Sequence, residues 1–296
     1  MATIGFIGLG NMGVPMAANL VKSGERVLGF DVLPGSRWAS AEFGVQVVAS
    51  ARRAAEDADV VVTMLPGGEQ VLTVWKDVLP AAKKDALFID CSTIDVASAR
   101  TAHALAAERG IAALDAPVSG GVGGAKGATL TFMVGGSVDA FARGKPVLDR
   151  MGKRIVHCGE AGNGQVAKIC NNLVLGASMI AVSEAFVLGE QLGLSHQALF
   201  DVVSGSSGQC WSLTSYCPVP GPVPASPANS GYKAGFAAAL MLKDLNLARQ
   251  AAQSAGVQAE LGVHAGQIYE QFAQGGHSAL DFSAIVNFVR QQSERR

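Results

Sequence analysis

Charge is scarce in this sequence and nowhere gathers into a basic cluster. Charged residues make up 16% of its 296 positions, and 23 Lys and Arg are nearly balanced by 24 Asp and Glu. Nucleic acids and anionic membranes are bound by basic patches that meet their phosphate charge. We therefore expect neither of these partners.

Cysteine and histidine lack the spacings that disulfide frameworks, metal sites and histidine-based catalysis need. The five cysteines are odd in number and scattered, without a Cys-x-x-Cys pair, and none of the five histidines pairs with a nucleophile or an acid. We predict no disulfide, no metal and a reducing compartment.

A secretory leader and a membrane span are not expected either. The chain begins Met1-Ala2-Thr3 and enters an apolar segment at once, which leaves no room for a charged region and a cleavage site. The longest apolar stretch, about 166–192, is interrupted by polar or charged residues: Lys168, Asn171, Asn172, Glu184 and Glu190. Both observations favour a cytoplasmic protein.

Apolar residues, at 49% of the chain, are plentiful for a protein with so few charges. Such a composition favours apolar surface that is buried between domains or subunits. We expect a homodimer or a homotetramer.

Short β-branched segments alternate with helical patterns through the first half of the chain. The segments predicted as strands are 4–7, 27–30, 60–65, 87–90 and 113–118, followed by 130–134 and 154–158. This alternation is typical of a parallel sheet in an α/β domain.

Strand patterns stop after about Gly164. The helices predicted beyond it cover 165–192, 195–204, 236–255, 261–274 and 281–292, and Pro218–Gly235, with five prolines, is predicted to be a loop. We predict an α/β domain over 1–162 and an all-helical domain over 163–296 that begins with a long interdomain helix.

A glycine-rich motif follows the first predicted strand and opens a helix: Gly8-Leu9-Gly10-Asn11-Met12-Gly13. Gly8 permits the tight turn, Gly10 lets the backbone approach a pyrophosphate, and Gly13 packs helix on strand. The second strand ends at Asp31, 18 residues after Gly13, where a carboxylate would bind ribose hydroxyls and repel a 2′-phosphate. This context predicts a Rossmann-type site for NAD rather than NADP, with ordinary turn glycines and a solvated acid as the alternative.

A second glycine-rich segment follows the strand that ends at Val118: Ser119-Gly120-Gly121-Val122-Gly123-Gly124. Ligands bind at the carboxyl edge of open α/β sheets, and bare amides with a hydroxyl suit a carboxylate. A flexible crossover to the next strand explains the segment equally well from its residues alone.

Lys168 lies on the first helix after the boundary, and Asn172 follows four residues later on the same face. Both faces of this helix are apolar, so we predict that it is buried and that Lys168 is not a surface lysine. Burial would lower the pKa of Lys168 toward the range of a proton-transfer group. The alternative is a lysine whose amine reaches water from the helix start.

Lys243 and Asp244 fall on a predicted helical stripe with Phe236, Leu240 and Leu247, where the pattern calls for apolar residues. A role in the site and a structural ion pair are both compatible with this placement.

Four blocks together resemble the β-hydroxyacid dehydrogenase family, from the first strand nearly to the C-terminus: 8–19 (GLGNMGVPMAAN), 115–127 (DAPVSGGVGGAKG), 162–172 (GNGQVAKICNN) and 243–245 (KDL). Residues 218–232 and the late QIYEQF and DFSAIVNFVR segments resemble the members of that family that oxidise 3-hydroxyisobutyrate in valine breakdown.

The resemblance implies an NAD-dependent oxidoreductase whose interdomain helix packs against another subunit. It implies that Lys168 is the catalytic acid and base and that Asn172 is its companion. With the glycine motif, it places the cofactor at Gly8, Gly10, Asn11, Met12, Gly13, Asp31, Leu65, Pro66, Thr93 and Lys243. It places the substrate at Ser119, Gly120, Gly121, Lys168, Asn172, Trp211, Phe236 and Asp244.

Two other functions stay open from the sequence. One is the reduction of tartronate semialdehyde, succinic semialdehyde or a related short acid, and the other is a non-catalytic dinucleotide-binding module. The presence of Lys168 and Asn172, and the lack of a basic appendage, favour an enzyme over the module.

Overall fold

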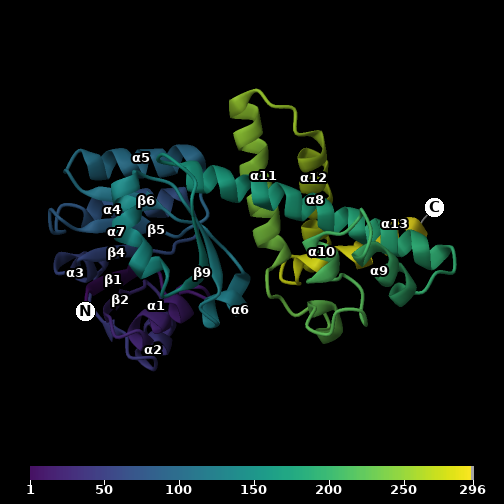
Figure 1. The fold of residues 1–296 in the computed structure, drawn as a ribbon, viewed down its shortest axis with the longest axis horizontal. Coiled ribbons are helices and arrows are strands. Elements are labelled where there is room, and N and C mark those ends of the chain that lie inside the picture. Colours follow the sequence, from purple (N-terminus) through teal and green to yellow (C-terminus); the bar gives the residue numbers. More distant parts are fainter. Residues whose placement is uncertain (295–296) are drawn as a thin grey trace. The chain divides into compact units, whose positions relative to one another are not determined.

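The computed structural model describes residues 1–294, and the chain divides into two compact units, Met1–Lys168 and the part from Ile169 onward. The first unit is built on a parallel sheet and the second is helical (Figure 1). The predicted fold class, a Rossmann-type domain followed by an all-α domain, is confirmed. The boundary near residue 162 stays a prediction.

Two sheets organise the first unit. Six parallel strands have the order β3-β2-β1-β4-β5-β6: β1 (Thr3–Ile7), β2 (Arg26–Phe30), β3 (Gln46–Val47), β4 (Val60–Thr63), β5 (Leu87–Asp90) and β6 (Ala112–Asp115). Three strands have the order β7-β8-β9: β7 (Val118–Ser119), β8 (Leu130–Val134) and β9 (Gly152–His157). The order of the larger sheet reverses between β1 and β4, the point at which open α/β sheets bind ligands.

The segment 113–118, predicted as one strand, is divided between the two sheets, so that prediction is wrong in its second half. Ala116 N still donates to the carbonyl of Asp90, the last residue of β5. Pro117 has no N–H to continue the ladder, and its carbonyl instead accepts from Met133 N of β8. The chain therefore leaves the larger sheet at this proline.

Helices cover both faces of the larger sheet: α1 (Gly13–Lys22), α2 (Pro34–Ala41), α3 (Ala51–Glu56), α4 (Gly68–Val78), α5 (Val96–Ala107) and α7 (Val138–Leu148). The short helix α6 (Gly121–Lys126) lies against α1 and against β8 of the smaller sheet. Successive side chains of a strand point to opposite faces, so Leu87 and Ile89 of β5 enter one core and Phe88 enters the other. Helices α1 and α7 cover the first core, and α3, α4 and α5 cover the second, where Trp75 meets Phe88 edge to face.

The described part of the second unit is helical: α8 (Asn163–Gln191, which begins in the first unit), α9 (His196–Ser204), α10 (Trp211–Thr214), η1 (Pro227–Ser230), α11 (Ala238–Ala255), α12 (Glu260–Phe272), η2 (Ala273–His277), η3 (Phe282–Ala284) and α13 (Ile285–Glu294). Helices α11 and α12 run side by side (Figure 1). Apart from η1, Pro218–Gly235 is a loop, as predicted.

Helix α8 is, among residues 1–294, the one helix long and apolar enough to cross a membrane. Core helices of other proteins share this length and composition, and 44% of its most apolar window is buried within the chain. Val174 and Leu188 are 64% and 61% exposed. The prediction that both faces of α8 are buried is therefore wrong for a single chain.

Buried polar side chains gather at the carboxyl ends of β4 and β5. Thr63 Oγ1 and Ser92 Oγ donate to Asp90 Oδ1 over 2.7 and 2.6 Å. Ser92 Oγ in turn accepts from Leu65 N at 2.8 Å, so Asp90 fixes the loop that follows β4. Burial raises the pKa of Asp90 from 3.8 to about 6, because desolvation disfavours its charged form.

We expect Asp90→Asn to flatten the pH dependence of stability. The folded chain holds the Asp90 proton more tightly than the unfolded chain. The buried charge therefore does not lower the free energy of unfolding below pH 3.8, and it lowers it by the full amount above about pH 6. Between about pH 4 and about pH 7.5, the wild type should lose about 2 to 3 kcal/mol more unfolding free energy than the variant. Urea unfolding followed by fluorescence measures this difference, and equal pH slopes would contradict it.

Candidate functional site

The loop between β1 and α1 has a shape that only glycine permits. Gly8 has φ +96°, and a Cβ there would lie 2.2 Å from Met64 O. A Cβ on Gly13 would lie 1.9 Å from Gly8 O, whereas at Gly10 it would meet nothing within 4 Å. Helix α1 begins here without a side-chain cap. Val14 N already donates to Gly10 O and Pro15 has no N–H, so the amides that face an anion here are those of residues 11–13. This cradle fits a dinucleotide pyrophosphate.

Asp31 joins the glycine-rich loop to the end of β2. Its Oδ2 accepts from Leu9 N at 2.7 Å and its Oδ1 accepts from Leu33 N at 2.8 Å. A carboxylate oxygen can accept more than one hydrogen bond, so Asp31 retains capacity for ribose hydroxyls. The predicted cofactor residues Asn11 and Met12 lie in this loop, Asn11 exposed and Met12 half-buried.

The other cofactor candidates of the first unit follow β4 and β5, which are neighbours in the sheet. Leu65 and Pro66 come after β4 and Thr93 comes after β5, so the three lie at the same carboxyl edge. The hydrogen bond from Leu65 N to Ser92 Oγ links the two loops directly.

The predicted carboxylate loop begins in the smaller sheet. Ser119 is half-buried in β7, where it pairs with Thr131, and Gly120 and Gly121 follow with φ of 134° and 59°. Residues with a side chain rarely adopt such φ angles, which explains the two glycines. Glycine has no side chain that could cover its backbone amide. Asn19 of α1 donates to the carbonyl of Ala125 in α6 at 2.6 Å, which ties the segment after this loop to the helix of the cofactor motif.

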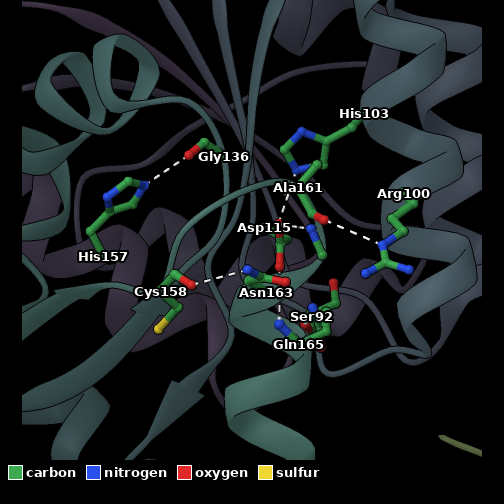
Figure 2. Close-up of polar contacts among 11 residues, drawn as sticks. Ser92, Arg100, His103, Asp115, Gly136, His157, Cys158, Ala161, Asn163 and Gln165 are labelled. Atoms are coloured by element: carbon green, nitrogen blue, oxygen red, sulfur yellow. Dashed lines mark hydrogen bonds and ion pairs between the residues drawn. The ribbon is translucent and has the colours of Figure 1, made fainter. Parts of the chain in front are cut away.

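The start of α8 is held by the buried carboxylate of Asp115, at the end of β6 (Figure 2). Asp115 Oδ1 accepts from Gly162 N at 2.8 Å and Oδ2 accepts from Gln165 N at 3.0 Å. His103 Nε2 lies 3.0 Å from Oδ1. Lys168 is on the next turn of the same helix and is 7% exposed, so its predicted burial is confirmed.

In the second unit, Asn172 donates to Asp244 Oδ2 at 2.5 Å, and both side chains are buried. The apolar stripe predicted for this part of α11 is wrong, because the helix begins at Ala238 and Leu240 is 48% exposed. The buried stripe instead contains Met241, Leu245 and Ala248, with Asp244 among them. Lys243 is half-buried.

Trp211 and Phe236 belong to one group of aromatic rings in the second unit. Trp211 stacks on Tyr216 with centroids 4.9 Å apart, Tyr216 stacks on Phe282, and Phe236 meets Phe282 edge to face. The buried Asp281 accepts from Tyr216 Oη at 2.9 Å and from Phe236 N at 3.1 Å. Asp281 therefore fixes the backbone of Phe236 and the ring of Tyr216, on which Trp211, 51% exposed, stacks.

The structure thus arranges the candidates in two groups, one in each unit. Sequence reasoning assigned no role to Asp115, Gln165, Ser92 or Asp281, although each holds a candidate residue or its loop. One of the four carried a usable signal, since Gln165 lies one turn before Lys168 on the same helical face. No group of His, Cys, Asp or Glu side chains within residues 1–294 is arranged to hold a metal ion.

Two family models match the chain. Residues 3–159 match the NAD binding domain of 6-phosphogluconate dehydrogenase, and residues 162–289 match the NAD-binding domain of NADP-dependent 3-hydroxyisobutyrate dehydrogenase. Dinucleotide binding is thus indicated over both segments.

Curated relatives match over nearly the whole chain. A probable 3-hydroxyisobutyrate dehydrogenase of Mycobacterium tuberculosis is 55% identical over 99% of this chain and 100% of its own. The 3-hydroxyisobutyrate dehydrogenase of Pseudomonas aeruginosa is 46% identical over 98% of this chain and 99% of its own. A solved structure of the M. tuberculosis enzyme with L-serine has a TM-score of 0.95 at 56% identity and covers 98% of this chain and 99% of that one. The cofactor of this chain is NAD.

We expect Asp31→Ala to weaken NADH binding by about 10- to 100-fold, the scale of hydrogen bonds to a charged group. NADPH binding should weaken less or improve, because the charge that repels a 2′-phosphate is removed. Titration of cofactor fluorescence measures both affinities. Asp31→Asn is the matched control, since it keeps one acceptor oxygen for the loop amides but lacks the charge. An unchanged ratio of the two affinities in both variants would rule out Asp31 as the discriminating residue.

Proposed function

This chain belongs to the β-hydroxyacid dehydrogenase family, and from that premise we propose that it oxidises 3-hydroxyisobutyrate to methylmalonate semialdehyde with NAD, as a step of valine breakdown. The match over nearly the whole chain to 3-hydroxyisobutyrate dehydrogenases carries the proposal. The L-serine in the solved relative supports the substrate class, because serine is also a β-hydroxy carboxylate.

The substrate carboxylate is assigned to the loop after β7. Ser119 would donate its hydroxyl, and Gly120 and Gly121 would donate their uncovered amides. Three donors on a short segment orient a carboxylate as well as bind it, which fixes the β-carbon for reaction. NAD, when bound, supplies the acceptor for the hydride that leaves this carbon.

Proton transfer is assigned to Lys168. Lys168 is buried, and its amine in the neutral form would take the proton of the substrate hydroxyl as the carbonyl forms. In the reverse reaction, the protonated amine would stabilise the developing alkoxide and return the proton. Asn172, one turn further along α8, would hold the substrate oxygen, and its own amide is oriented by Asp244.

The remaining candidates, Trp211, Phe236 and Lys243, all belong to the second unit. We assign Trp211 and Phe236 to the wall of the substrate pocket and Lys243 to the cofactor. The stacking of Trp211 on Tyr216 gives this wall a fixed ring orientation.

NADH formation at 340 nm tests the proposal directly. The wild type should turn over 3-hydroxyisobutyrate with NAD faster than glycerate, 4-hydroxybutyrate or serine, and faster with NAD than with NADP. A preference for another acid would leave the reaction class intact and overturn the substrate. Cofactor binding without turnover on any acid would instead indicate a non-catalytic module.

The variant Lys168→Ala, measured in the same assay, tests the role of Lys168 in proton transfer. Its turnover should fall by about two to four orders of magnitude, the scale of a general acid–base group, while NADH affinity stays nearly unchanged. Unchanged turnover would remove Lys168 from the mechanism.

A homo-oligomer is the second part of the proposal. The exposed face of α8 carries large apolar side chains, including Val166, Val174 and Leu188, which water contacts in the single chain. Helix faces of this kind are covered in soluble proteins by another apolar surface. We propose that a second copy of the chain covers this face.

The double variant Val174→Glu/Leu188→Glu should convert the oligomer into a monomer, because each added charge would be desolvated at the interface. Gln70→Glu, which adds a charge at an exposed position of α4 away from α8, should keep the wild-type mass. Light scattering after size-exclusion chromatography gives the masses. A monomeric wild type, or a double variant of unchanged mass, would refute the interface.

A further inference from the structure

We propose that Gln165 is a positioning residue for the reaction, because its side chain clamps the loop after β5 to the first turn of α8 and so sets where Lys168 lies relative to that loop. This inference rests on the proposed function, and in particular on the role of Lys168. All the contacts that carry it lie within the first unit.

Both polar ends of the Gln165 side chain bind the backbone around Thr93. Its Nε2 donates to Ser92 O at 2.8 Å, and its Oε1 accepts from Ile94 N at 3.1 Å. Gln165 has no solvent exposure, so water does not compete for these bonds. The candidate cofactor residue Thr93 is thus held on both sides by one amide group.

The backbone of Gln165 is fixed separately by Asp115. Its N–H donates to Asp115 Oδ2, while the other oxygen of this carboxylate accepts from Gly162 N (Figure 2). The two bonds satisfy helix-start amides that would otherwise be buried without acceptors. The helix therefore cannot rotate at its start without breaking charge-assisted hydrogen bonds.

Close packing restricts the same turn further. A Cβ on Gly164 would lie 2.4 Å from Met133 O and 2.5 Å from Asp115 O, so the helix start lies directly against β6 and β8. The turn that precedes Lys168 is therefore held by its backbone, by a neighbouring carboxylate and by the Gln165 amide.

Helical spacing connects this clamp to the chemistry. Gln165, Lys168 and Asn172 follow at intervals of three and four residues, which places them on one face of α8. Proton transfer depends steeply on geometry, and a displacement of about 1 Å can cost about 100-fold in rate. A side chain that fixes the turn before Lys168 therefore acts on turnover through the lysine.

The test is a double-mutant cycle with Gln165→Met, which keeps the length of the side chain and removes both hydrogen bonds. We expect kcat to fall by about 10- to 100-fold, with KM for the substrate within about 3-fold of the wild type and a smaller loss of NADH affinity than of kcat, since the loosened loop also carries Thr93. In a Lys168→Ala background, the same substitution should lower turnover by less than about 2-fold, since the group it positions is gone.

The matched control is Asn163→Ala on the same turn. Asn163 Nδ2 donates to Cys158 O at 3.2 Å, away from the loop after β5. It should leave kcat within about 3-fold of the wild type, because a helix turn held by Asp115 tolerates the loss of one peripheral hydrogen bond. An equal loss in Asn163→Ala and Gln165→Met, or an equal effect of Gln165→Met with and without Lys168, would overturn the proposal in favour of general destabilisation.

Amide hydrogen exchange of the cofactor-free protein gives a readout independent of activity. Gln165→Met should speed exchange at the amide of Ile94, which loses its acceptor, while the strands of the larger sheet exchange as in the wild type. Unchanged exchange at Ile94 would refute the clamp even if turnover fell. If the Met variant does not fold, Gln165→Glu, which keeps the acceptor for Ile94 N and loses the donor to Ser92 O, takes its place in the same cycle.

Failure of this proposal and failure of the proposed function are distinguishable. A wild type without turnover on 3-hydroxyisobutyrate overturns the function, and exchange at Ile94 then still decides whether the clamp exists. A wild type with full turnover and an unaffected Gln165→Met variant overturns the positioning role alone.

Discussion

Backbone N–H groups at the start of α8 are buried and must find acceptors, because a helix cannot satisfy its own first amides. Asp115 supplies both oxygens of one carboxylate to them. The cost of burying that charge is offset by hydrogen bonds from two amides and by His103. A helix start fixed in this way determines the register of every later residue of α8, including Lys168.

Much of the fold could be predicted from local patterns, and the errors have physical causes. Short β-branched segments and helical patterns located nearly all the strands and long helices, because the central strands of a parallel sheet are buried on both faces and most helices on one. The two-residue strand β3 was missed because Gln46 and Val47 are exposed and too few to form a pattern. The single strand predicted over 113–118 ignored Pro117, whose missing N–H sends the chain into the second sheet.

The site was predictable where its chemistry is local in sequence. The spacing of Gly8, Gly10 and Gly13 predicts the tight turn between the first strand and its helix. Asp31 follows the next strand directly, so its place at the same edge of the sheet was also predictable. The partners of Asn172 and Gln165 were not predictable, because Asp244 and Ser92 lie 72 and 73 residues away in the chain. Only tertiary packing brings such pairs together, and the apolar stripe expected on α11 pointed to the wrong neighbours.

The polar residues of α8 hold an otherwise apolar helix in one arrangement. A buried amide without a partner costs about 1 to 3 kcal/mol, so each polar side chain on this helix favours one arrangement over its neighbours. Gln165 is satisfied by the backbone of 92–94 and Asn172 by Asp244. These bonds fix the turns on either side of Lys168, because a rotation or slip of α8 would break them. The position of Lys168 along α8 is therefore fixed by the two amides together with the buried carboxyl groups of Asp115 and Asp244 that accept hydrogen bonds from this helix.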